Sequence, residues 1–249
     1  MSQLVRTVAI ARSLVVYHGL PGRQRRLRRL YRQFVGPGDL AFDLGAHVGN
    51  RTRALRALGC RVIALEPQPD CARLLRRFFG GSANVEVIEA AAGAIRGRTA
   101  LAISDRHPTM TTTATAWRAA RERDPVFAGV RWNAMTTVEA TTLDALIARF
   151  GMPAFVKVDV EGAEPEVLAG LGQAPRSLSF EYLPGALDGA RDCVERLAAL
   201  GAYRYNWSPG ETYELASVAW MPADGLLAAL RTREAQRRSG DVYARLEAT

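Results

Sequence analysis

The sequence predicts an α/β fold: a doubly wound, mostly parallel seven-stranded sheet that ends in an antiparallel hairpin and follows a helical N-terminal extension. Three observations support this prediction. Short apolar runs recur along the chain and end in acids, helical patterns lie between several of them, and two alternating segments flank the turn Ser208-Pro209-Gly210. Alternation of strands and helices is typical of right-handed crossovers in a parallel sheet, and the turn indicates the hairpin.

The first 36 residues predict the helical extension. Helical patterns cover residues 3–17 and 22–34, and the Gly-Pro-Gly stretch at 36–38 ends the second helix. Arg6 and Arg12 interrupt the apolar pattern of the first helix, so it is typical neither of a signal peptide nor of a membrane span. We therefore expect a cytoplasmic protein without a membrane partner.

Residues 37–249 predict one main domain. Its central strands are almost continuously apolar, as in a parallel sheet that is covered on both faces. The expected strands are 40–43, 62–66, 85–89, 155–159 and 178–181, the expected helices are 49–58, 69–79, 142–150, 163–171 and 189–200, and the expected hairpin joins 202–207 to 213–220. An insertion or lid is expected at about 92–141, with strands at 99–103 and 135–140 and a Thr-rich loop at 109–115.

The chain is basic, with a net charge of +8 and a pI near 10.0. Arginines cluster at 23–32 and at 231–238, whereas Lys157 is the only lysine. The excess charge allows one alternative hypothesis, a basic nucleic-acid-binding protein. We attribute the arginines instead to solvated helix faces and a GC-rich genome, and we expect no nucleic-acid partner. The three cysteines form no CxxC pair, so neither a disulfide framework nor a zinc site is indicated.

Acidic residues end all five central strands: Asp43, Glu66, Glu89, Asp159 and Glu181. Ligands of an open α/β sheet bind beyond the carboxyl ends of its strands. The acids are therefore expected to form a rim around one cleft, which suits a ligand with hydroxyl groups and a positive charge. S-adenosylmethionine has both, in its ribose diol, its ammonium and its sulfonium.

The loop after the first strand fits this ligand. Gly45 allows a tight strand-to-helix turn, Gly49 allows close packing, and the N–H groups at the helix start suit a carboxylate. A dinucleotide loop would have the pattern GxGxxG, and the middle glycine is missing, so a nicotinamide-dependent oxidoreductase is only the alternative. The expected cofactor-binding residues are Asp43, Gly45, Ala46, His47, Gly49, Asn50, Thr52, Glu66, Pro67, Glu89, Ala90 and Asp159.

Two acids of the rim have specific expected roles. Glu66 lies 21 residues after Gly45, at the end of the next strand. From there its carboxylate is expected to accept hydrogen bonds from both ribose hydroxyls. Glu89 ends the third strand and is expected near the adenine amine, although a surface acid would give the same pattern.

The segment from Lys157 to Glu164 places charged groups together. Because side chains alternate along a strand, Lys157, Asp159 and Glu161 point to the same side. Lys157 can then hold one of the two acids ionised, in a functional site or in a structural ion pair. The nearby acids, including Glu164, also suit Mg²⁺, but nothing in their spacing requires it, and we predict no metal.

Six stretches resemble the FkbM-type methyltransferase family, in that family's order. They are FDLGAHVGNRT, VIALEPQP, VEVIEAAAG, TTLDAL, VKVDVEGAEPEVLAG and LSFEY, within about residues 37–183. The resemblance implies a Rossmann-like fold and methyl transfer from S-adenosylmethionine, usually to a hydroxyl of a sugar or natural product. It places the cofactor loop at 43–50, the ribose acid at Glu66 and the acceptor side at 157–164 with Glu181.

An alcohol needs a base that removes its proton as it attacks a methyl group. Asp159 or Glu161 is the expected base, and Lys157 and Glu181 are expected to orient a small-molecule acceptor. Within the insertion, His107 offers another base if a lid closes. Trp117 and Trp132 flank the insertion and either line the acceptor site or pack in a core.

Overall fold

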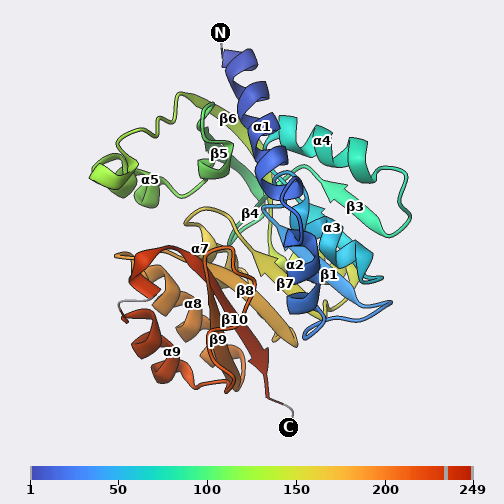
Figure 1. Ribbon diagram of the computed structural model, residues 1–249, viewed down its shortest axis with the longest axis vertical. Coiled ribbons are helices and arrows are strands. Elements are labelled where there is room, and N and C mark those ends of the chain that lie inside the picture. Colours follow the sequence, from blue (N-terminus) through green and yellow to red (C-terminus); the bar gives the residue numbers. More distant parts are fainter. Residues whose placement is uncertain (1, 233–234, 248–249) are drawn as a thin grey trace.

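The computed structural model describes residues 2–232 and 235–247 and shows helices on both faces of one large sheet (Figure 1). The helices are α1 (Ser2–His18), α2 (Arg23–Tyr31), α3 (Asn50–Ala57), α4 (Pro69–Phe79), α5 (Thr115–Glu122), α6 (Leu143–Phe150), α7 (Glu164–Ala169), α8 (Leu187–Leu200) and α9 (Ala223–Leu230), with 3-10 turns η1 (Pro108–Met110), η2 (Pro125–Phe127) and η3 (Ala235–Arg237). The strands are β1 (Leu40–Leu44), β2 (Arg61–Leu65), β3 (Val85–Ile88), β4 (Ala91–Ala92), β5 (Gly97–Ile103), β6 (Ala134–Thr141), β7 (Phe155–Val158), β8 (Ser177–Tyr182), β9 (Tyr203–Pro209) and β10 (Gly240–Leu246).

Seven strands form the main sheet, in the order β3-β2-β1-β7-β8-β10-β9. The strands from β3 to β8 in this order are parallel, and β10 runs antiparallel to both β8 and β9. The predicted α/β fold with a mostly parallel sheet and a final antiparallel pair is therefore confirmed. The strand order reverses between β1 and β7, and ligands of such sheets bind at the carboxyl ends beside this point.

Two hydrophobic layers explain the almost continuous apolar strands. Phe42 and Phe180 face α6 to α9, whereas Ala41 and Phe155 face α2 and α3. Neighbouring residues of one strand thus enter opposite layers, because side chains alternate along a strand. Both faces of the sheet must be apolar for this packing.

Local signals set several helix boundaries. Thr142 caps α6, since its hydroxyl accepts a 3.1 Å hydrogen bond from the N–H of Ala145. Gly151 ends this helix with a φ of 97°, which favours glycine. Pro69 occupies the first position of α4, where its missing N–H costs nothing, and α4 spans the predicted range 69–79.

The N-terminal helices pack against the main sheet. Leu27 and Tyr31 of α2 are buried in the same cluster as Phe155 of β7. Ile10 of α1 packs with Cys71 of α4. No described helix is both long enough and apolar enough to cross a membrane.

The insertion forms a second, three-stranded sheet in the order β4-β6-β5. The expected strands at 99–103 and 135–140 are confirmed as parts of β5 and β6. The expected Thr-rich loop instead contains η1 and a backbone bridge between Ala102 and Thr112. Helix α5, which follows it, has no counterpart in the sequence prediction.

The prediction that residues 213–220 form the second arm of the hairpin is wrong. β9 pairs along its length with β10, from Tyr203 opposite Leu246 to Pro209 opposite Gly240. Residues 213–220 instead form an irregular segment, in which Tyr213 has a φ of 59°. A non-glycine residue with this φ cannot continue a strand, so alternation alone misassigned the segment.

Candidate active site

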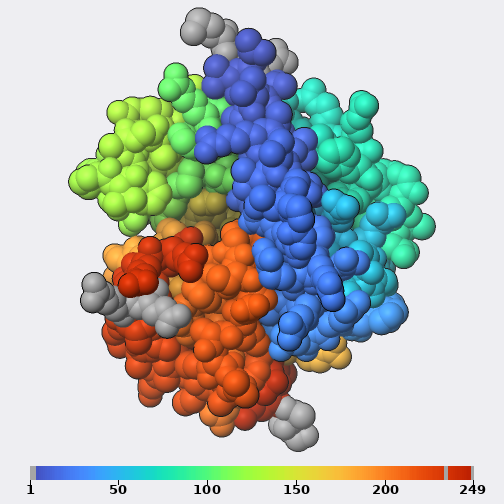
Figure 2. Space-filling view, viewed as in Figure 1, coloured from blue at the N-terminus to red at the C-terminus, as the bar shows by residue number. Residues whose placement is uncertain are grey.

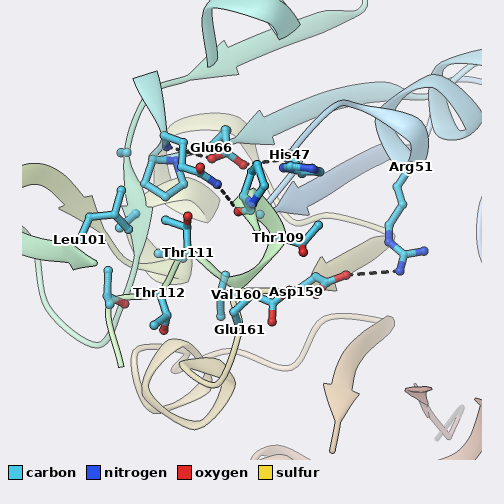
Figure 3. A pocket seen from close by; sticks show the side chains of 18 of the residues that line it. His47, Arg51, Glu66, Leu101, Thr109, Thr111, Thr112, Asp159, Val160 and Glu161 are labelled. Carbon is cyan, nitrogen blue, oxygen red and sulfur yellow. Dashed lines mark hydrogen bonds and ion pairs between the residues drawn. The ribbon is translucent and has the colours of Figure 1, made fainter. Parts of the chain in front are cut away.

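A cavity that opens to solvent lies beyond the carboxyl ends of β1, β2 and β7 (Figure 3). Its walls come from the first loop, the turn after β2, the insertion and α1. The lining includes Gly45, His47, Asn50, Glu66, Pro67, Ala90, Asp159 and Glu161, all of them residues singled out in the sequence. The structure thus brings the two expected halves of the site to one cavity.

Three acids of the expected rim, Asp43, Glu89 and Glu181, lie outside the cavity lining, and the first two lie away from the other acids. Asp43 is fully buried beneath the first loop, where Oδ2 accepts a 2.5 Å hydrogen bond from the hydroxyl of Thr52. Glu89 forms a 2.6 Å ion pair with Arg76 on the protein surface. We therefore regard Asp43 and Thr52 as supports of the loop and leave Glu89 out of the proposed site.

The two glycines of the first loop permit contacts that no other residue allows. Gly45 has a φ of 79°, and a Cβ there would lie 1.7 Å from the carbonyl oxygen of Asp159. Gly49 has a φ of 80°, and a Cβ there would lie 2.7 Å from a methyl carbon of Leu75 and 2.7 Å from the ring of Phe79. Gly45 therefore lets β1 and β7 close together at the cavity, and Gly49 seats α3 beside α4. Ala46, between them, is buried in the small core under this loop.

Glu66 directly follows β2 and faces the cavity (Figure 3). Its Oε2 accepts a 2.8 Å hydrogen bond from the N–H of His47, and its Oε1 accepts one of 2.8 Å from the N–H of Gln68. Both oxygens are thereby fixed, and each keeps a lone pair for a ligand hydroxyl. Burial raises the pKa of Glu66 to about 7.

His47 acts on the site through its backbone. Its N–H orients Glu66, and its φ of 48° lies in the left-handed region. The imidazole is half-buried with its Nε2 shielded from solvent, and this desolvation lowers its pKa to about 4, so the ring is neutral at ordinary pH. A neutral ring is a poor proton carrier between pH 6 and 8.

A buried charge network lies on the opposite wall. The ammonium of Lys157 is 3.2 Å from Asp159 and 2.9 Å from Asp241. Arg51 also lies between these acids, 3.3 Å from Asp159 and 3.5 Å from Asp241. Burial opposes ionisation of Asp159, but Lys157 and Arg51 outweigh it and lower the pKa of this acid. Asp159 is therefore an ionised acid on the cavity wall, and the positive charges of Lys157 and Arg51 balance its negative charge.

Glu161 and Glu181 differ from Asp159 in having no ion pair among the described residues. One carboxylate oxygen of each acid lies within 4.8 Å of the others. Burial raises the pKa of Glu161, and the neighbouring Glu181 raises it further. Burial likewise raises the pKa of Glu181, with Asp159 as the next cause. These two carboxyls thus hold protons more strongly than ordinary glutamates do.

Glu164 holds the turn that carries Glu161. Its Oε1 accepts a 2.8 Å hydrogen bond from the N–H of Val160, and its Oε2 accepts one of 2.9 Å from the N–H of Gly162. Glu161 itself has a φ of 55°, an uncommon conformation for a glutamate. The bonds to Glu164 fix this conformation, so the Glu161 side chain points toward the cavity (Figure 3).

The insertion covers the cavity from the other side. Gln68 donates a 2.8 Å hydrogen bond to the carbonyl oxygen of Pro108 and so ties η1 to the turn after β2. Thr109, Thr111 and Thr112 face Asp159 and Glu161 across the cavity (Figure 3). The Thr-rich segment therefore forms the wall of the cavity opposite Asp159 and Glu161.

The aromatic residues of the insertion pack beside the turn that contains Glu161 and Gly162. A Cβ on Gly162 would lie 2.2 Å from the Trp117 ring, so the indole rests directly on this glycine. Trp132 meets Trp117 edge-on at 6.1 Å and donates a 2.7 Å hydrogen bond to the carbonyl oxygen of Met110. His107 precedes η1 and does not line the cavity.

Among the residues absent from the expected site are Arg51 and Tyr17, which line the cavity, and Asp241, which belongs to the buried charge network. Arg51 follows the first loop directly, yet only the fold shows that it reaches Asp159. Asp241 belongs to β10, a strand that was not predicted. Tyr17 comes from α1, which is held over the site because Arg6 lies 2.6 Å from Asp105 of the insertion. The arginine-rich composition hides Arg51, and no local pattern marks the other two.

Comparison with known proteins gives one family match. A family model described as the methyltransferase FkbM domain matches residues 43–186, which is more than half of the chain. No curated protein matches the chain.

Solved structures give distant likenesses. A putative O-methyltransferase from Klebsiella pneumoniae is 12% identical, with 96% of this chain and 90% of that chain covered and a TM-score of 0.47. A TehB-like SAM-dependent methyltransferase from Corynebacterium glutamicum is 9% identical, with 95% and 94% covered and a TM-score of 0.46. An rRNA methylase from Streptococcus thermophilus is 11% identical, with 88% and 94% covered and a TM-score of 0.43. TM-scores below 0.5 are too low to bear on function.

The family match runs from Asp43 in β1 to residue 186 just after β8 and so includes the carboxyl ends of β1, β2 and β7 that border the cavity. It includes Glu66, Asp159, Glu161 and Glu181, which the structure gathers around the cavity or just behind its wall. It decides against the nicotinamide-dependent alternative. The chain belongs to the FkbM methyltransferase family and is an S-adenosylmethionine-dependent methyltransferase.

Proposed function

We propose that the enzyme is an O-methyltransferase that methylates a hydroxyl of a small molecule, such as a sugar or a secondary metabolite. The observation that carries the proposal is the pair Glu161 and Glu181. Their carboxyls lie beside the cavity without an ion pair in the described chain, and their pKa values are raised by burial and by neighbouring acids. An alcohol acceptor needs such a group, because it must lose a proton as it reacts.

The cavity lining offers the kinds of surface that S-adenosylmethionine needs. Ala90, Leu101 and Pro108 are apolar lining residues that suit a flat base. Asn50 and Asp159 are polar lining residues that suit an amino acid group. We propose that Glu66 holds the ribose hydroxyls, since both of its oxygens are fixed by backbone N–H groups.

The first loop would hold the rest of the cofactor. Gly45, His47 and Pro67 contribute wall surface, and Gly49 precedes α3, whose first residue Asn50 lines the cavity. The N–H groups of the first turn of α3 suit a carboxylate there. When bound, S-adenosylmethionine supplies an electrophilic methyl group.

We propose Glu161 as the general base. It lines the cavity, and its raised pKa makes its ionised form a stronger base than Asp159, whose pKa is lowered. Glu181 lies behind it and can share or receive the proton, because the two carboxyls are neighbours. This assignment selects between the two bases that the sequence left open.

Lys157 and Asp159 are proposed as positioning residues. Lys157 is fully buried and cannot touch an acceptor directly, so it acts through Asp159, which is 3.2 Å away. Asp159, held ionised by Lys157 and Arg51, can accept a hydrogen bond from the acceptor or from the cofactor ammonium. We likewise propose residues 37–249 as the methyltransferase domain, 1–36 as its helical extension and about 92–141 as the lid.

The test is a search for the methylated product. The full chain is incubated with methyl-labelled S-adenosylmethionine and a panel of monosaccharides, disaccharides, phenols and a ribo-oligonucleotide, and products are assigned by mass spectrometry and NMR. We expect an O-methyl ether on a sugar or phenol. Methylation at carbon or nitrogen, or methylation of the oligonucleotide alone, would refute the proposal.

A further inference from the structure

We propose that α1 and α2 form a peripheral docking face for an anionic lipid bilayer. The proposal does not depend on the acceptor or on the base. It departs from the expectation, drawn from the sequence, that the protein has no membrane partner. Three observations carry it: the outward side chains of α1, the outward side chains of α2, and the distribution of charge along the whole chain.

The outward face of α1 is aliphatic. Ala9, Ile10 and Ser13 are buried against the protein body. A helix turns about 100° per residue, which places another set of residues opposite this buried side, within an arc of about 60°. We call this set the aliphatic stripe: Leu4, Val8, Ala11 and Val15, of which Leu4, Val8 and Val15 are 73%, 61% and 69% exposed.

The outward face of α2 is cationic. Leu27, Leu30 and Tyr31 are buried in the core. The same geometry places arginines opposite them, and we call these the arginine stripe: Arg25, Arg29 and Arg32, all exposed, with the exposed Arg26 beside them. None of these four arginines forms an ion pair within residues 2–232 and 235–247.

Helices α1 and α2, which carry the two stripes, lie on one side of the molecule (Figure 2). Helices α1 and α2 follow each other along a single ridge, drawn in blue down the front of the space-filling view (Figure 2). The short connection at 19–22 joins them, and Arg23 clamps it by donating a 2.7 Å hydrogen bond to the carbonyl oxygen of Val16. The ridge therefore presents an aliphatic half and a cationic half to the same surroundings.

The charge of the chain is concentrated in this ridge. Residues 1–38 contain eight arginines and no acid, which equals the net charge of +8 for the whole protein. The remaining sequence is therefore electrically balanced. A charge excess confined to one helical segment indicates an anionic partner for that segment, and not a generally basic surface.

A bilayer with anionic headgroups matches both halves at once. Aliphatic side chains of an interfacial helix enter the boundary of the acyl chains, and arginines bind the phosphates beside it. A nucleic acid would use the arginine stripe but has no use for four outward aliphatic residues. A second copy of the chain would cover the aliphatic stripe but would bring two sets of unpaired arginines near each other.

Docking by this face would also place the active site near the bilayer. The inner side of α1 contributes Tyr17 to the cavity wall, and Arg6 of α1 lies 2.6 Å from Asp105 of the insertion. The helix that meets the lipid on its outer side therefore touches the lid on its inner side.

The test is co-sedimentation of the full chain with vesicles of phosphatidylcholine alone and of phosphatidylcholine with one third phosphatidylglycerol. We expect binding to the anionic vesicles to be stronger by at least about tenfold. The double variants Val8→Gln/Val15→Gln and Arg25→Gln/Arg29→Gln should each reduce this binding at least about fivefold. All four positions are exposed, so unchanged circular dichroism and unchanged cofactor affinity should accompany the loss.

Matched controls carry the same substitutions elsewhere. Val126→Gln/Val218→Gln removes two valines that are 86% and 102% exposed, and Arg96→Gln/Arg123→Gln removes two exposed arginines. These variants should bind as the wild type does. Three outcomes would overturn the proposal: no vesicle binding, equal binding to both vesicle types, or a dimer in solution that Val8→Gln/Val15→Gln dissociates. Binding of an oligonucleotide that needs Arg25 and Arg29 in place of vesicle binding would also overturn it.

Discussion

Asp241 on β10 lies directly opposite Glu181 on β8, yet the two carboxyls have opposite surroundings. Asp241 is 2.9 Å from the ammonium of Lys157 and 3.5 Å from Arg51. Glu181 has no ion pair in the described part of the chain and lies with Glu161 and Asp159. Asp241 therefore belongs to the charged framework of the site, whereas we propose that Glu181 takes part in the reaction.

Replacement of these two acids should separate the roles. Asp241→Asn leaves two buried cations with one fewer acid, so we expect the free energy of unfolding to fall by about 3 kcal/mol. Glu181→Gln removes an acid whose burial disfavours its ionised form, so stability at pH 8 should stay within about 1 kcal/mol or rise. Urea denaturation of both variants measures this. Equal losses of stability would show that Glu181 is as much a framework residue as Asp241.

Cofactor affinity should depend on the protonation of Glu66. Its pKa is raised to about 7 by burial, and ribose hydroxyls donate hydrogen bonds to its ionised form. Binding of S-adenosylmethionine should therefore tighten as the pH rises from 6 to 8. Calorimetric titration of Glu66→Gln is the control, because the ammonium of the cofactor still titrates there. If the affinity for S-adenosylmethionine changed only weakly with pH, and in the same way for the wild type and Glu66→Gln, the ribose role of Glu66 would be contradicted.

The same raised pKa affects folding in the opposite direction. Glu66 gives up its proton less readily in the folded protein than in the unfolded chain. It therefore contributes stability that is complete below the unfolded pKa, near 4.3, and is lost as the pH rises through about 7. In Glu66→Gln the decline of stability between pH 5 and 8 should be smaller.

Gly45 should be intolerant of a methyl group for a steric reason. Gly45 and Gly38 both have positive φ angles, 79° and 85°. A Cβ at Gly45 meets the carbonyl oxygen of Asp159 at 1.7 Å, whereas a Cβ at Gly38 meets nothing within 4 Å. Gly38→Ala should therefore lower the free energy of unfolding by only about 1 kcal/mol, because alanine is strained at this positive φ, and it should leave cofactor affinity unchanged. Gly45→Ala should lose more stability and most cofactor affinity, and similar behaviour of the two variants would contradict the clash.

Removal of divalent metal should leave turnover unchanged. Asp159, Glu161 and Glu181 have oxygens close enough to hold a cation. Asp159 is already balanced by Lys157 at 3.2 Å, which reduces the attraction for a second charge. Dialysis against EDTA should change the rate by less than about twofold, and added Mg²⁺ should not raise it. A loss that Mg²⁺ restores would make this cluster a metal site.

Most of the fold could be predicted because its signals are local. The apolar runs of β1, β2 and β7 and the Pro69 start of α4 are visible in short windows of sequence. The placement of β10 is not, because it pairs with β8 and β9 across long sequence separations. Residues 213–220 alternate as a strand does, but the φ of Tyr213 excludes one.

The candidate site shows the same division. The first loop, Glu66 and the Lys157–Glu164 segment were predicted because strand ends of a parallel sheet converge at one edge. Asp43 and Glu89 met the same criterion, and only packing shows that one is buried under the loop and the other is paired with Arg76. Arg51 and Asp241 reach the site through tertiary contacts that leave no mark on the sequence.

The most direct test of the proposed reaction is the rate of methyl transfer by Glu161→Gln. Glutamine keeps the size of the side chain but cannot remove a proton. Turnover should fall at least about 100-fold while the Kd for S-adenosylmethionine changes less than about threefold. In the wild type the rate should rise with pH, because the raised pKa of Glu161 must be passed before the base is ionised. Near-normal turnover of Glu161→Gln, with an unchanged pH profile, would contradict the account.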